Sequence, residues 1–131
     1  MKTSTFARNT QLDEIASLAA AGFLRLYSAP MAESPDAAVP RDAQLISEHR
    51  LSSPAFEGAF NGTIKAKPIA DDPEARVSAT AAWFRVTQSN GASVLWDGTV
   101  GERGADMIFT RPNIQAKARV SISTLTITQP A

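Results

Sequence analysis

The chain has 131 residues, with 13 basic and 13 acidic side chains, one histidine and no cysteine. This length is typical of a single domain that buries its own core, so we expect one domain over residues 1–131. Without cysteine there is no thiol nucleophile, no disulfide and no cysteine-type zinc site. The zero net charge argues against a nucleic-acid partner, because proteins that bind phosphate backbones normally carry a basic excess. No cofactor or metal is expected.

The amino-terminal third contains no membrane or targeting signal. The longest apolar run, residues 15–24, is interrupted by Ser17 and Gly22 and is shorter than the roughly 20 residues that cross a bilayer. We therefore expect a soluble protein that is made in a cytoplasm and does not contact a membrane.

The first predicted element is a helix over residues 10–22. Thr10 is its predicted N-cap, Asp13 stands three residues later in the position of a capping box, and Gly22 supplies the stop. Residues 1–9 show no periodicity and are expected to form a flexible arm. This arm contributes two candidate interface residues, Phe6 and Arg8.

A short strand at residues 23–27 and a long loop at residues 28–42 follow the helix. The loop is rich in proline and alanine and lacks periodicity. Loops of this length within a compact domain tend to be disordered or used for binding. Its candidate interface residues are Pro30, Pro35 and Pro40.

Three more strands are predicted, at residues 45–51, 60–67 and 76–88. Asn90-Gly91 then indicates a two-residue type I′ hairpin, since both residue types tolerate positive φ. This register places Arg85 opposite Trp96.

Trp83, Arg85 and Trp96 are expected on one face of this hairpin, and they complete the set of candidate interface residues. Aromatic side chains on a sheet face can stack on sugar rings, and Arg85 opposite Trp96 would add a cation–π contact. Packing in the core or at an interface is the favoured interpretation, because a small domain has few other large residues to fill its interior.

The carboxyl-terminal part predicts a long strand from residue 114 onward. Its apolar side chains alternate up to Ile122, and the alternation then shifts by one residue to Leu125 and Ile127. Such a shift requires a bulge near Ser123-Thr124 or a strand that changes sheets. About seven strands and one amino-terminal helix predict an all-β fold, either a β-sandwich of jelly-roll type or a partly closed barrel.

Two polar regions are considered as candidate sites, one for metal binding and one for catalysis. Asp71, Asp72 and Glu74 offer oxygen ligands, but their spacing does not match a calcium-binding loop, and Pro73 favours a solvated turn. His49 has no paired nucleophile motif around it, so a half-buried strand histidine with a local hydrogen bond is the favoured interpretation. No catalytic residue is assigned.

The order of segments resembles a family of small virion proteins of tailed bacteriophages. The resemblance runs from residue 12 onward, and it rests on packing and turn motifs. These are residues 24–27, the Ser53-Pro54-Ala55-Phe56 turn, the run 80–86, the Asp97-Gly98-Thr99-Val100-Gly101 segment, residues 104–107 and the closing segment 120–128.

The resemblance implies a capsid decoration, or cement, protein that binds the outside of the phage head and stabilises it without enzymatic activity. The implied partners are the major capsid protein and two further copies in a homotrimer, and the implied location is the virion surface, after assembly in the host cytoplasm. A head-to-tail connector or tail-tube subunit and a carbohydrate-binding β-sandwich module are the alternatives.

Overall fold

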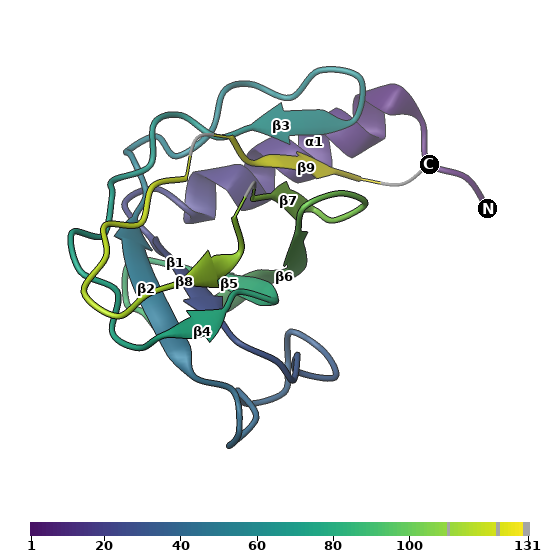
Figure 1. Ribbon diagram of the computed structural model, residues 1–131. Coiled ribbons are helices and arrows are strands. Elements are labelled where there is room, and N and C mark those ends of the chain that lie inside the picture. Colours follow the sequence, from purple (N-terminus) through teal and green to yellow (C-terminus); the bar gives the residue numbers. More distant parts are fainter. Residues whose placement is uncertain (110, 123, 130–131) are drawn as a thin grey trace.

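The structure is a computed structural model that describes residues 1–109, 111–122 and 124–129 (Figure 1). The helix and strands, in chain order, are α1 (Thr5–Leu18), β1 (Phe23–Tyr27), β2 (Leu45–Arg50), β3 (Thr63–Lys65), β4 (Ala79–Thr80), β5 (Trp83–Thr87), β6 (Val94–Gly101), β7 (Met107–Ile108), β8 (Asn113–Ile114) and β9 (Thr126–Thr128). Within these ranges no helix is long and apolar enough to cross a membrane.

The main sheet has the strand order β2-β1-β5-β6-β7. Its first four strands pair antiparallel, whereas β7 runs parallel to β6. Two short antiparallel pairs, β3–β9 and β4–β8, lie outside this sheet, and α1 packs near β3 (Figure 1). The prediction of a mostly β protein with one amino-terminal helix is therefore confirmed, and the sheet is curled and mixed.

The helix begins five residues earlier than predicted. Ser4 caps α1 by accepting a hydrogen bond from the Ala7 N–H at 3.1 Å, and the helix ends at Leu18. Thr10 lies inside the helix, where its hydroxyl donates to the Phe6 carbonyl at 2.9 Å. The predicted helix 10–22 and flexible arm 1–9 are thus wrong, because Ser4 offers the same capping chemistry as Thr10.

Gly22 connects α1 to β1 at a point of close backbone approach. A Cβ atom at this position would overlap the Thr87 carbonyl oxygen and lie 2.9 Å from that of Ala19. The glycine therefore lets the chain turn directly from the helix into the sheet.

The Asn90-Gly91 turn is not a two-residue hairpin. The Gln88 N–H donates to the Ser93 carbonyl at 2.9 Å, so the loop spans residues 89–92, and of the two turn residues only Gly91 has positive φ. The Asn90 side-chain oxygen accepts hydrogen bonds from the N–H groups of Ala92 and Ser93. An asparagine that satisfies the turn through its side chain does not need the left-handed backbone of a type I′ turn.

This longer loop shifts the predicted register by one residue. Arg85 lies opposite Asp97, Val86 lies opposite Trp96, and the register is irregular after Val86. Because strand side chains alternate, the shift places Trp96 on the opposite face of the sheet from Trp83 and Arg85.

A second Asn-Gly pair forms the type I′ hairpin instead. Asn61 and Gly62 have φ values of 52° and 72°. Phe60 and Thr63 flank them and exchange backbone hydrogen bonds of 2.9 and 3.0 Å. The predicted strand at residues 60–67 is therefore interrupted by a tight turn, and β3 begins after it.

The long strand predicted from residue 114 onward is broken. β8 ends at Ile114, and a turn at Lys117 with φ 69° separates it from Val120, which pairs with Asp72. The shift in alternation is real, since Val120, Ile122 and Leu125 are buried. Ser123, where the bulge was predicted, lies outside the described residues.

The sheet has an apolar cluster on each face. The larger one joins α1 to β1, β2, β5 and the carboxyl-terminal segment, and includes Leu12, Leu24 and Phe84. The smaller one joins Tyr27 and Trp83, stacked at 4.7 Å, to Ala32. The loop at residues 28–42 therefore packs against the second face of the sheet.

Candidate functional site

Trp83 and Arg85 lie in the interior, beneath the proline-rich loop. The Trp83 indole Nε1 donates to the Ser28 carbonyl at 2.9 Å. Arg85 makes a bidentate ion pair with Asp97 at 2.7 and 2.9 Å, and it also donates to the Ala37 carbonyl at 2.8 Å. Both side chains fasten the loop to the sheet, so neither is placed to contact a partner.

The prolines of the loop differ in exposure. Pro30 and Pro35 are exposed, whereas Pro40 is half-buried. The backbone between them is held at the carbonyls of Ser34 and Ala37, which accept hydrogen bonds from Arg85. This loop presents a fixed surface.

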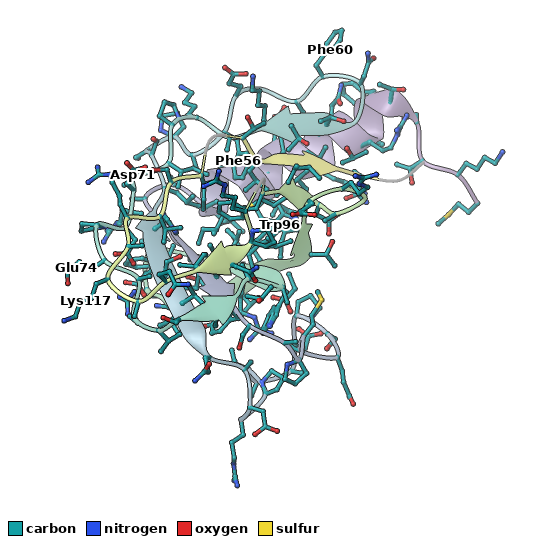
Figure 2. The ribbon with its side chains drawn as sticks, in the orientation of Figure 1. Phe56, Phe60, Asp71, Glu74, Trp96 and Lys117 are labelled. Atoms are coloured by element: carbon teal, nitrogen blue, oxygen red, sulfur yellow. The ribbon has the colours of Figure 1, made fainter. Side chains whose placement is uncertain are left out.

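Trp96 is half-buried and packs against Phe56 (Figure 2). The two rings meet edge to face, with centroids 5.6 Å apart. Arg85 lies 5.4 Å from the Trp83 ring, so the predicted cation–π contact between Arg85 and Trp96 is wrong. Trp96 also lines a groove of about 370 Å³ together with Asp106 and residues 126–128.

Phe6 and Arg8 belong to the first turns of α1. Phe6 is 81% exposed, and Arg8 is half-buried, with its Nη2 donating to the Thr5 hydroxyl at 3.0 Å. The Arg8 guanidinium lies against Gly62, because a Cβ atom at residue 62 would be 2.7 Å from Arg8 Nη1. Arg8 thus packs beside the hairpin at residues 60–63.

Phe60 is the prominent surface residue that sequence reasoning missed. Its side chain is 75% exposed and points away from the body of the protein (Figure 2). Two α1 side chains fix the hairpin that carries it: Asp13 Oδ1 accepts from the Ala59 N–H, and Asn9 Oδ1 accepts from the Gly62 N–H, both at 2.8 Å.

Phe6 extends this surface along α1. Phe6, Asn9 and Asp13 are spaced by three and four residues and share one stripe of the helix. We call the combination of this helix end and the hairpin at residues 60–63 the Phe6/Phe60 tip. The Asn61-Gly62 dipeptide was the available signal for the hairpin, and only the fold shows that it presents an exposed aromatic ring.

Ser47 and His49 have the spacing of a nucleophile and its base but lie in the core. The Ser47 hydroxyl is 2.9 Å from His49 Nε2, and His49 Nδ1 is 2.8 Å from the Ala70 carbonyl. Both side chains are fully buried, so no substrate reaches them. With Nδ1 donating to the Ala70 carbonyl, Nε2 of the neutral ring accepts a hydrogen bond from the Ser47 hydroxyl, and this pair has a structural role.

Burial lowers the pKa of His49 below its ordinary value of 6.5, and the Ala70 carbonyl and the negative charge of Asp72 oppose this only in part. The folded protein therefore holds the neutral ring, while the unfolded chain takes up a proton below about pH 6.5. Stability is fully present above that pH and falls as the pH drops toward the folded pKa, by up to about 1.4 kcal/mol per pH unit.

We expect urea midpoints to fall between pH 7 and pH 5 in the natural protein and to be flatter for His49→Leu. His49 is the single histidine of the chain, which makes the assignment direct. Equal slopes for the two proteins would contradict this explanation.

Asp71 and Asp72, in the acidic turn at residues 71–74, form hydrogen bonds and ion pairs with other residues of the chain. Asp72 Oδ2 accepts from the Glu48 N–H and from Arg76, both at 2.9 Å. Asp71 pairs with Arg119 at 2.9 Å, and hydrogen bonds from Ser121 and Arg119 lower its pKa. Among the residues that the structure describes, no group of three His, Asp or Glu side chains is placed to hold a metal ion.

Comparisons with known proteins return no relative. No protein-family model matches the chain, and no curated protein or solved structure matches it significantly.

Proposed function

We propose that this chain is a decoration protein of a tailed-phage capsid, which binds the outer head surface and stabilises the shell without enzymatic activity. The observation that carries the proposal is the Phe6/Phe60 tip. An aromatic side chain held out in water on a rigid hairpin is poised to bind a partner, because little conformational freedom remains to be lost on association.

The arrangement of polar groups supports a structural role. The buried charged side chains Arg85, Asp97 and Asp72 are held in internal hydrogen bonds, and the Ser47–His49 pair is sealed from solvent. A subunit that occurs in many copies gains attachment strength from multivalency, so each contact need only be modest. The zero net charge limits repulsion between neighbouring copies.

On this proposal the protein forms a homotrimer on the major capsid protein, and its curled sheet is a partly closed barrel or jelly-roll-like sandwich. Its location is the virion surface, reached after synthesis in the host cytoplasm. Native mass spectrometry tests the assembly: trimers support decoration, while rings of six or twelve support the alternative of a connector or tail-tube subunit.

Attachment to heads is the direct test. Phe60→Ser should weaken binding to purified capsids of the encoding phage by about thirtyfold, the scale of a hot-spot aromatic residue. Met31→Ser is the matched control, since Met31 is also an exposed apolar side chain but lies in the β1–β2 loop, away from the hairpin. Co-sedimentation with heads measures both variants. Failure of the natural protein to bind heads, or equal losses for the two variants, would contradict the proposal.

The groove beside Trp96 favours the second alternative, a carbohydrate-binding module. Trp96 lines this groove together with Asp106, Thr126 and Thr128, whose side chains carry oxygen atoms. A specific hit on a glycan array that is lost in Trp96→Ala would support this function over decoration.

A further inference from the structure

The main sheet has two edges, and the β2 edge is covered by the chain itself. The Arg76 N–H donates to the Ile46 carbonyl at 2.8 Å, and the Ala70 N–H donates to the Arg50 carbonyl at 3.1 Å. Between them, Asp72 accepts from the Glu48 N–H. A further strand therefore cannot pair at this edge without displacing residues 70–76.

The β7 edge is different. The Phe109 N–H donates to the Gly101 carbonyl at 2.8 Å, so Phe109 faces β6, and the alternation of the strand turns the N–H and C=O of Ile108 away from β6. Outside the β6–β7 ladder, no hydrogen bond joins the Ile108 backbone to another described residue. The Ile108 side chain is 55% exposed.

A second edge, unpaired among the residues that the structure describes, lies across from β7. Val120 exchanges backbone hydrogen bonds of 2.8 and 3.0 Å with Asp72. Its neighbours Arg119 and Ser121 flank this isolated bridge and make no backbone-to-backbone hydrogen bond with the described residues. A groove of about 560 Å³ lies between this segment and β7, and Ile108, Arg119 and Ser121 all line it.

The groove combines an apolar lining with the basic side chain of Arg111, while the second lining arginine, Arg119, is paired with Asp71. Met107, Ile114 and Val120 line it and are buried. Arg111 and Arg119 also line it, and no Asp or Glu appears among its described lining residues. A segment that enters the groove is thus favoured if it alternates apolar side chains and carries an acidic residue.

The same charge argument disfavours the amino terminus of a second copy. That segment protrudes from the domain, as Figure 1 shows, but it carries Lys2 and no acidic residue. Like charges would face each other at Arg111. A segment of a different protein is the occupant that the charges favour.

We propose that the groove between β7 and residues 118–122 binds an extended, acidic segment of the partner by strand addition. This inference rests on the proposed function, which supplies a partner at the head surface. The added strand pairs with Ile108 on one side and with Arg119 and Ser121 on the other, and its acidic side chain pairs with Arg111. It thereby bridges the β7 edge to the carboxyl-terminal segment.

A synthetic peptide tests the groove without any capsid. The probe is a short peptide of alternating valine and threonine with a glutamate at each end, added to the isolated protein and followed by amide NMR. We expect shifts at Ile108 and Ser121, and about tenfold weaker binding when lysines replace the glutamates, the scale of one charge-assisted hydrogen bond.

Two variants sharpen the test. Ile108→Pro removes the outward N–H, which the β6–β7 ladder does not use, and should abolish binding, whereas Ile108→Ala keeps that N–H and should retain it. Arg111→Glu should reverse the preference for the glutamate peptide. If Ile108→Pro fails to fold, the Arg111→Glu variant tests the proposal by itself, because the natural Arg111 side chain is exposed.

The outcomes separate the two proposals. Absence of shifts at Ile108 and Ser121, or equal binding of both peptides, overturns the groove proposal even where the protein attaches to heads. Peptide binding by a protein that does not attach to heads supports the groove and overturns the decoration function.

Discussion

Asp97→Ala is expected to destabilise the protein by about 3–5 kcal/mol, the usual cost of removing one partner from a buried ion pair. The side chains of Arg85 and Asp97 are 7% and 2% exposed, and burial of the guanidinium is tolerated because Asp97 binds it through two hydrogen bonds. Hydrogen bonding to Asp97 also raises the pKa of Arg85. Without the carboxylate, a charge remains buried with only backbone carbonyls of the loop as partners.

Glu48→Ala is the matched control for Asp97→Ala. It breaks the pair between Arg25 and Glu48, whose side chains are 23% and 30% exposed and whose charges are therefore screened by water. We expect a loss of about 1 kcal/mol or less for this variant. Urea unfolding curves measure both, and similar losses would show that burial does not govern the Arg85–Asp97 pair.

Asp97→Ala also tests how the proline-rich loop is held on the sheet. Since Arg85 donates to the Ala37 carbonyl, a guanidinium that leaves its position releases the loop from the sheet. Limited proteolysis of Asp97→Ala should therefore cut near residues 34–37 faster than in the natural protein. An unchanged cleavage rate would mean that Trp83 and Tyr27 hold the loop without Arg85.

Asp72→Ala is the second large effect, with an expected loss of about 3 kcal/mol. Its carboxylate accepts from the N–H groups of Glu48 and Glu74 and from Arg76, and hydrogen bonds to a charged group contribute roughly 1.5–3 kcal/mol each. Burial alone would raise the pKa of Asp72, but these donors outweigh it and hold the pKa below 3.8. This stabilisation is present above about pH 4 and disappears as the pH falls through the lowered pKa.

Asp71→Ala is the matched control for Asp72. The two aspartates are neighbours, yet Asp71 pairs with the exposed Arg119 at the surface, so we expect a much smaller loss of stability. Urea unfolding curves measure both variants, and Asp72→Ala should lose far more stability than Asp71→Ala. An Asp72→Ala variant as stable as the natural protein would contradict the assigned role of this side chain.

Local patterns were sufficient to predict the class of fold. Alternation located β1 at residues 23–27, and the mostly β content with one amino-terminal helix followed from the same signals. The shift in alternation near residue 123 was also visible in the order of residues, because burial imposes a period of two wherever one face is apolar. Each of these predictions depends only on neighbours along the chain.

Predictions that depended on choosing between equivalent local signals were unreliable. Ser4 and Thr10 are both capping residues, and α1 uses the first of them. The chain also has two Asn-Gly pairs, and only the pair at residues 61–62 forms the type I′ hairpin. The other one closes a longer loop, and this single difference reversed the predicted face of Trp96.

Three features are properties of the amino-acid sequence alone: the equal numbers of basic and acidic side chains, the absence of cysteine, and the periodicity of the apolar residues. Only the tertiary structure decided how the charges are used, because burial and partner geometry arise from segments far apart in the chain. Folding places Arg85 and Asp72 in internal contacts, and it leaves Phe60 and the β7 edge open to a partner.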